Sequence, residues 1–84
     1  MVKDEIWSVS MDRAGAFFQA QQDVIEESHM VFRFGACRIT LKEAAPKQMR
    51  DWAMPRVQVY IEGEESDVKK IYHRFMLQFL TAGG

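Results

Sequence analysis

The sequence lacks most of the features that would place the chain in a specialised class of protein. It has one cysteine, Cys37, so it can form no internal disulfide and no zinc site built from several cysteines. No apolar run approaches the ~18 residues of a membrane-spanning helix, and no charged and then apolar leader opens the chain. We therefore expect a cytoplasmic protein with no metal, no cofactor and no membrane partner.

Strong net charge is also absent, but the charges are unevenly distributed. The chain carries a net charge of −1. Residues 1–28 hold six acidic and two basic side chains, a balance of −4, whereas residues 29–61 hold six basic and two acidic ones, a balance of +4. An anionic partner would bind the basic middle of the chain. Ordinary surface charge accounts for the same distribution.

Apolar bulk is plentiful. Hydrophobic residues make up 48% of the 84 residues, and they include six Phe, two Trp and six Met. This is enough for one core without a disulfide, and the chain is too short for two cores. We expect a single domain over residues 1–84.

Hydrophobic periodicity predicts the order β-α-β-β-α. Alternation predicts strands at 6–11, 30–41 and 56–62, and helical spacing predicts helices at 12–28 and 64–80. Pro46 suits the first turn of a short extra helix that ends near Met54, before Pro55. Residues 81–84 are interpreted as a frayed helix end.

The alternation within residues 30–41 changes parity. Phe32 and Phe34 share one face, but Cys37 and Ile39 have the opposite parity. A bulge or a two-residue hairpin turn at Gly35-Ala36 would bring both groups to the core. We predict an α+β two-layer sandwich, in which two main helices cover one face of a small antiparallel sheet and the other face is partly open.

That open face is the first candidate site. The polar side chains of its strands should lie together there, and the candidates for anion binding are Arg33, Arg38, Arg56, Gln58 and Tyr60. Guanidinium groups bind phosphate or carboxylate, and a tyrosine can stack on a base. A solvated face, or one covered by residues 46–54, is the alternative.

The second candidate is a protein interface. Exposed Trp, Met and Arg are enriched at interfaces. Met49, Trp52 and Met54 lie in an irregular segment, and Leu77 falls on the polar side of the last helix. Trp52 could equally close the core. A sheet of about three strands also leaves edges with which a second copy could pair, so we favour homodimerisation.

Catalysis has little support in the sequence. Cys37 lies on the inward side of its strand, where cysteine behaves as a small hydrophobe. A nucleophilic role would need His29 or His73 within hydrogen-bond reach, but His73 is predicted on the outer face of its helix. Neither histidine has further metal ligands at a suitable spacing.

Two short segments resemble known families. Gly83-Gly84 resembles the diglycine tails of ubiquitin-like sulfur carriers, in which the tail extends from a strand; here it follows a predicted helix, and we interpret it as the end of that helix. Residues 59–63, followed by a helix, resemble the strand–helix corner of acylphosphatase-type ferredoxin-like folds. The Gly-rich phosphate loop of that activity has no counterpart near the first strand.

The function that we expect is a non-enzymatic interaction or regulatory module that binds a protein partner, as a homodimer. Binding of nucleic acid or another polyanion through the arginine-bearing face is the alternative, and a small enzyme is the third hypothesis.

Overall fold

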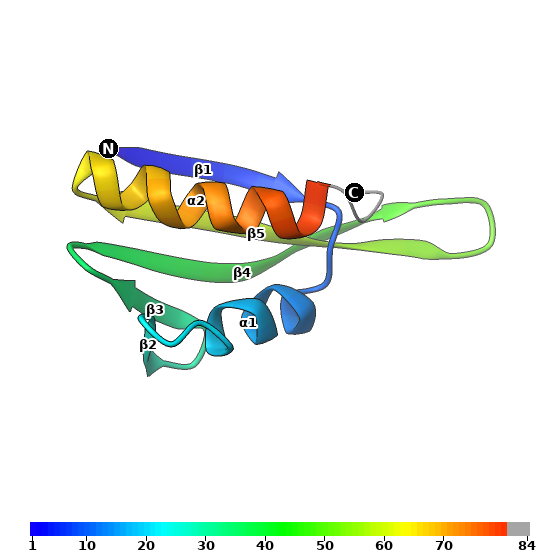
Figure 1. The fold of residues 1–84 in the computed structure, drawn as a ribbon. Coiled ribbons are helices and arrows are strands. Elements are labelled where there is room, and N and C mark those ends of the chain that lie inside the picture. Colours follow the sequence, from blue (N-terminus) through cyan, green and yellow to red (C-terminus); the bar gives the residue numbers. More distant parts are fainter. Residues whose placement is uncertain (81–84) are drawn as a thin grey trace.

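The computed structural model describes residues 1–80. Its elements are β1 (Val2–Trp7), α1 (Met11–Gln19), β2 (Ile25–Ser28), β3 (Val31–Phe34), β4 (Cys37–Gln48), β5 (Ala53–Gly63) and α2 (Glu65–Leu80). The strands form one antiparallel sheet in the order β1-β5-β4-β3-β2. Both helices lie on one face of it (Figure 1). The predicted α+β two-layer architecture is confirmed.

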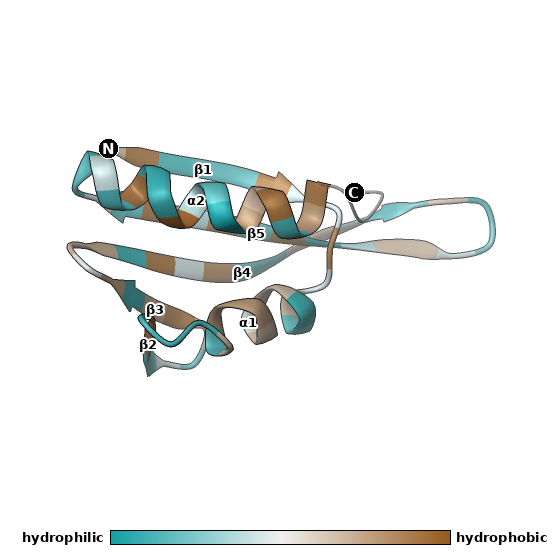
Figure 2. Ribbon diagram, in the orientation of Figure 1, coloured by the Kyte–Doolittle hydropathy of each residue, from teal (hydrophilic) through white to brown (hydrophobic). Residues whose placement is uncertain are grey.

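The core lies between the sheet and the two helices. Alternate residues of the central strands, such as Phe32 and Ile61, are fully buried. Phe75 of α2 stacks on Phe18 of α1 with ring centroids 5.5 Å apart, and Trp7 of β1 meets Phe75 edge-on at 5.1 Å. In Figure 2 the hydrophobic colour is concentrated in these strands and helices. One apolar layer thus holds both helices to the sheet.

The parity change in residues 30–41 is a hairpin turn. Phe34 and Cys37 are register partners, so Gly35 and Ala36 form a two-residue connection between β3 and β4. Gly35 has a φ of 55°, which is accessible to glycine without strain. Phe32, Phe34 and Cys37 are all buried, as the sequence predicted.

The last helix is also confirmed. The Glu64 carboxylate accepts the backbone N–H of Asp67 at 3.0 Å and the Ser66 hydroxyl at 2.6 Å. These hydrogen bonds to Ser66 and Asp67 hold the pKa of Glu64 below its usual value. Asp67 in turn accepts the N–H of Ala36 at 2.9 Å and so links the helix start to the β3–β4 turn. The expected frayed end at residues 81–84 lies outside the described residues.

The first predicted helix is too long. α1 ends at Gln19, and residues 25–28, predicted as its last turn, form the edge strand β2. The Ser10 hydroxyl caps the helix by accepting the N–H of Arg13 at 3.2 Å. Val24 and Ile25 fall at helical spacing, but Ile25 pairs with Arg33 of β3 and is 65% exposed. The free edge of β3 offers backbone hydrogen-bond partners to residues 25–28, and these residues therefore form a strand. Hydrophobic periodicity does not reveal such partners.

The first predicted strand is displaced. β1 covers residues 2–7 rather than 6–11, and Trp7 lies on its inward side, packed against the core. On this side Glu5 accepts the Tyr72 hydroxyl at 2.7 Å and the Trp7 indole N–H at 3.1 Å. Desolvation, then the Glu5 hydrogen bond, raises the pKa of Tyr72 to about 12. A polar residue on the inward face obscured the alternation of this strand.

The predicted short helix at residues 46–54 is wrong. β4 and β5 continue through this region as a long hairpin, closed by the N–H of Met49 donating to the carbonyl of Trp52 at 2.8 Å. Pro46 lies in a register shift between Ala44 and Lys47 instead of a helical first turn. β3 pairs with β4 as far as Thr40, and β1 pairs with β5 as far as Trp7–Val57. Residues 42–56 therefore find strand partners only within the hairpin, and we call them the arm (Figure 1).

Among residues 1–80, no helix is long and apolar enough to cross a membrane.

Candidate functional site

The face of the sheet turned away from the helices is accessible, as predicted. We call it the open face; across the body of the sheet it carries Val2, Asp4, Ile6, Ile25, Glu27, Val31, Arg33, Arg38, Thr40, Gln58, Tyr60 and Glu62. The side chains of Arg33 and Arg38 are 44% and 49% exposed. The protein's own chain therefore does not cover these arginines.

The three predicted arginines do not form one cluster. Arg33 and Arg38 are register partners on β3 and β4, and Glu27 lies 2.8 Å from the Nε of Arg33 and 3.7 Å from that of Arg38. Arg56 lies opposite Ala44, six residues along β5 from the partner of Arg38, or about 20 Å at the usual rise of a strand. Its Nε donates to the carbonyl of Ala45 at 2.7 Å. Two paired arginines and one distant arginine do not make a single anion site.

Gln58 and Tyr60 lie between these arginines, as the alternation predicted. The Gln58 amide donates to Asp4 at 2.8 Å, and the Tyr60 hydroxyl donates to Glu62 at 3.1 Å. The hydrogen bond to Glu62 raises the pKa of Tyr60. A hollow of about 310 Å³ lies here, and its lining residues are Asp4, Thr40, Lys42, Gln58 and Tyr60. Carboxylates therefore accompany the cations across the open face.

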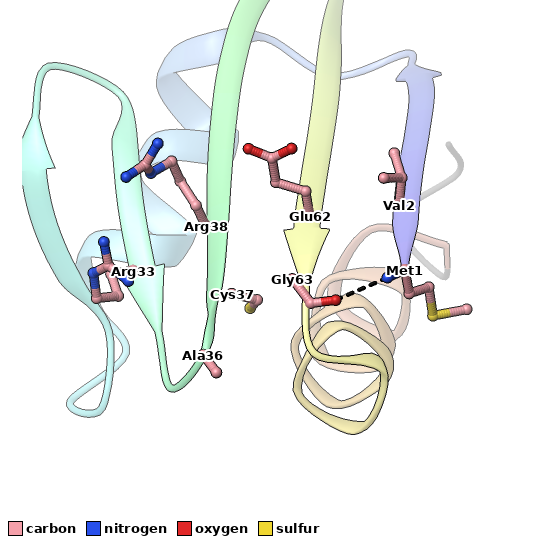
Figure 3. A pocket seen from close by; sticks show the side chains of 8 residues that line it. All are labelled: Met1, Val2, Arg33, Ala36, Cys37, Arg38, Glu62 and Gly63. Atoms are coloured by element: carbon pink, nitrogen blue, oxygen red, sulfur yellow. Dashed lines mark hydrogen bonds between the residues drawn. The ribbon is translucent and has the colours of Figure 1, made fainter.

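A second hollow, of about 480 Å³, lies at the far end of the open face from the arm (Figure 3). Arg33, Arg38 and Glu62 line it, and the N-terminal ammonium of Met1 donates to the carbonyl of Gly63 at 2.8 Å. Cys37 also lines it but is only 2% exposed, and burial raises the pKa of its thiol. A raised pKa disfavours the thiolate that a nucleophile needs.

Metal ligands do not gather in the part of the chain that the structure describes. Within it, no group of three or more His, Cys, Asp or Glu side chains could hold a metal ion. His29 and His73 are both exposed, and His73 lies on the outer side of α2, as predicted.

The arm brings three of the four predicted interface residues together. Met49 and Trp52 pair at its tip, and Met54 pairs with Lys47. Because the register shift adds one residue to β4 after Ala44, these residues lie on the same side as Arg56, which is the side of the open face. Trp52 is 55% exposed. The arm thus extends the open face with an apolar tip.

Leu77 lies elsewhere. It is on the outer side of α2 and is 56% exposed, so the helix layer and the sheet separate it from the side of the open face. The helical period placed it correctly on the solvent side, but it shares no surface with Trp52.

The edges of the arm are poorly suited to adding another strand. Pro46 is on one strand and Pro55 on the other, and neither has an N–H to donate. The register shift between Ala44 and Lys47 distorts the edge of β4 further. A partner would therefore bind the arm by its side-chain faces.

The arm and the rest of the protein have opposite charge. Residues 42–56 hold four basic and two acidic side chains, a balance of +2, and the other described residues hold seven basic and ten acidic ones, a balance of −3. The arm thus carries half of the +4 balance of residues 29–61, and Arg33 and Arg38 carry the other half.

One basic surface was missed by the sequence reasoning. Lys69, Lys70, His73 and Arg74 line a hollow of about 490 Å³ on the outer side of α2. Their helical spacing was the available signal. Asp23 binds Arg74 through two oxygens, at 2.8 and 3.0 Å, which lowers the pKa of Asp23, and Glu65 lies 3.6 Å from Lys69.

A family model described as archaeal MoaD-like protein matches residues 2–84 of the chain. No curated protein matches it.

Proposed function

This chain belongs to the archaeal MoaD-like protein family, and from that premise we propose that it is a small cytoplasmic protein-binding module that acts by docking rather than by catalysis. The single observation that carries the proposal is the arm, with Met49, Trp52 and Met54 on one side. Partner binding at this surface is the means by which such a module would regulate or assist another protein.

The composition of the arm supports this function. Tryptophan and methionine are enriched in the buried centres of interfaces, and arginine is the charged residue most often found there. Trp52 is 55% exposed at the tip, and Arg56 lies on the same side near the base. A contiguous apolar tip with a basic surround would bury its apolar area on binding and keep its cations near the rim.

The arm also adds nothing to the core. The buried hydrophobic residues of the described chain include none between Leu41 and Val57. Its side chains are therefore available to a partner without unfolding the body of the protein.

Site-specific photo-crosslinking in the native host tests the proposal. A photo-reactive amino acid replaces Trp52, and in a matched control it replaces Lys70, which is exposed on the outer side of α2. We expect a discrete protein adduct from position 52 and none from position 70. Adducts of equal yield from both positions, or none from position 52, would overturn the proposal.

A second function, that of a diglycine carrier, is favoured by a separate observation. The matched residues include Gly83-Gly84, which resembles the tails of ubiquitin-like sulfur carriers. A helix, α2, extends to Leu80, whereas the tail of those carriers extends from a strand. α2 ends on the side of the molecule from which the arm projects (Figure 1). A protein docked on the arm would therefore lie close to the chain end that leads into the diglycine.

This second function requires a free carboxyl group on Gly84 to which sulfur could be bound. Intact-mass measurement of the protein purified from its native host tests it directly. A species in which one oxygen is replaced by sulfur, absent from a Gly84→Ala variant, is the expected result. A chain that continues beyond Gly84, or one that never carries sulfur, rules it out.

A further inference from the structure

We propose that the partner of the arm is a second copy of this chain, docked so that the arm of each copy lies across the open face of the other about a twofold axis. This inference deepens the proposed function, because it names the occupant of the same surface. Such a contact is isologous, so each favourable pair occurs twice.

The apolar residues of the two surfaces are complementary. The arm presents Trp52, with Met49 and Met54 beside it. On the open face, Val2 and Ile6 of β1 are 55% and 57% exposed, and Asp4 between them pairs with Tyr60 of β5. An exposed aliphatic pair next to a tyrosine ring is a suitable surface for an indole side chain.

The charges are complementary as well. Lys47 and Arg56 lie on the apolar side of the arm, whereas Asp4 and Glu62 lie on the part of the open face formed by β1 and β5. An antiparallel arrangement of two copies would bring the cations of each arm to the carboxylates of the other body. The overall balances of +2 for the arm and −3 for the rest of the described chain favour the same arrangement.

The shape of the protein permits this contact. The described chain measures 42 × 24 × 21 Å, and the arm projects along the long direction from one end of the sheet. Two copies with opposed long axes can each place the arm on the other's body. A stable dimer needs about 800 Å² from each partner, and the surface of one copy is 5298 Å². Pro46 and Pro55 disfavour strand addition at the arm edges, so contact through the faces is the remaining mode.

Light scattering on size-separated protein tests the contact. We expect a dimer for the natural sequence. Trp52→Ala, and separately the double variant Lys47→Glu with Arg56→Glu, should each raise the dissociation constant at least about tenfold. The matched control is Lys70→Glu, which reverses an exposed charge on the outer side of α2 and should leave the dimer unchanged. Circular dichroism confirms that each variant is folded.

Charge exchange gives the decisive result. The double variant Asp4→Lys with Glu62→Lys should also dimerise weakly alone, because its arm and its body are then both basic. An equimolar mixture of it with the Lys47→Glu/Arg56→Glu variant restores opposite charges in both contact regions and should form a heterodimer. A mixture that stays monomeric, or a natural protein that is monomeric at all concentrations, overturns the inference.

The two proposals fail separately. In the crosslinking experiment, a position-52 adduct of twice the 9.8 kDa chain mass supports the second copy as partner. An adduct with a different protein, together with a monomer in light scattering, overturns the dimer but leaves the protein-binding function intact.

Discussion

Gly63 is the position at which a single methyl group should harm this fold most. It ends β5 with a φ of 144°, in a backbone region that is largely restricted to glycine. A Cβ added there would lie 2.2 Å from the carbonyl oxygen of Ala36 and 2.5 Å from the Cα of Cys37. Both are backbone atoms of the β3–β4 turn and the start of β4, so neither can move aside as a side chain could.

The expected cost of Gly63→Ala follows from these two effects. Backbone strain contributes roughly 1–3 kcal/mol, and forcing an added group into a filled space contributes about 1–3 kcal/mol more. The end of β5 is also hydrogen-bonded to two other parts of the chain. The N–H of Gly63 donates to the carbonyl of Met1, next to β1, at 3.0 Å, and the N–H of Glu64 donates to the carbonyl of Ala36, in the β3–β4 turn, at 3.0 Å. We expect a total loss of about 2–6 kcal/mol, a large part of the roughly 4–12 kcal/mol typical of a domain of this size.

Gly35→Ala is the matched comparison. Gly35 also has a positive φ, of 55°, but the atom that a Cβ would meet is Oδ2 of the Asp67 side chain at 2.7 Å. That carboxylate can rotate away, at the cost of its hydrogen bond to Ala36. We expect a loss of about 2 kcal/mol for this variant. Urea unfolding followed by far-ultraviolet circular dichroism measures both, and a Gly63→Ala loss no larger than that of Gly35→Ala would refute the steric reasoning.

Three further predictions concern the side chains of Tyr72, Phe75 and Glu27. The pKa of Tyr72 is raised from 10.0 to about 12, so the stability that its protonated hydroxyl contributes is present below pH 10 and is lost as the pH rises from about 10 to 12. The free energy of unfolding of Tyr72→Phe should therefore decline less steeply over that range than that of the natural protein. An unchanged pH profile would contradict this. Phe75 is fully buried against four other rings, so Phe75→Ala should lower the free energy of unfolding by about 3–5 kcal/mol in urea titrations. A loss below about 1 kcal/mol would show that the site is not closely packed. Glu27 contacts both Arg33 and Arg38, so the polyanion-binding alternative predicts that Glu27→Gln strengthens single-stranded RNA binding at low salt; unchanged affinity would count against that alternative.

Alternation predicted the parts of the fold in which every second residue is buried. Phe32 and Phe34, then Cys37 and Ile39, required a bulge or a two-residue turn between them, and the structure has the turn, at Gly35-Ala36. Helical spacing predicted α2 in the same way. The outward positions of Arg33 and Arg38 followed from the same alternation, so the existence of an open face could be predicted.

The errors lie where a segment with helical spacing instead pairs with a neighbouring strand. Residues 25–28 have helical spacing, but they form a strand because the edge of β3 is free to pair. Glu27 belongs to this strand, so its contacts with Arg33 and Arg38 could not be predicted from a helix. The partial compensation of the Arg33 and Arg38 charges by Glu27 was missed for the same reason.

The arm was missed because its sequence suits a helix locally. Met49, Trp52 and Ala53 form a short apolar stripe at helical spacing after Pro46. The preference of a short segment is weak, however, and the strong alternation from Val57 to Ile61 continues into the arm as paired strands. Strand pairing within the hairpin determined the structure here, and it also brought Met49 and Met54 beside Trp52.

The arm has an exposed apolar face and edges that carry proline, and this combination favours one specific contact over non-specific association. A two-stranded hairpin with no third strand is marginally stable in water, and residues 42–56 have strand partners only within the hairpin. Covering one of its faces would stabilise it, and Trp52 offers that face the largest apolar area. Proline in both strands, at Pro46 and Pro55, limits the edges as sites of open-ended strand addition. A surface that is attractive on one face and blocked at its edges favours a single closed contact, which is what a small binding module requires.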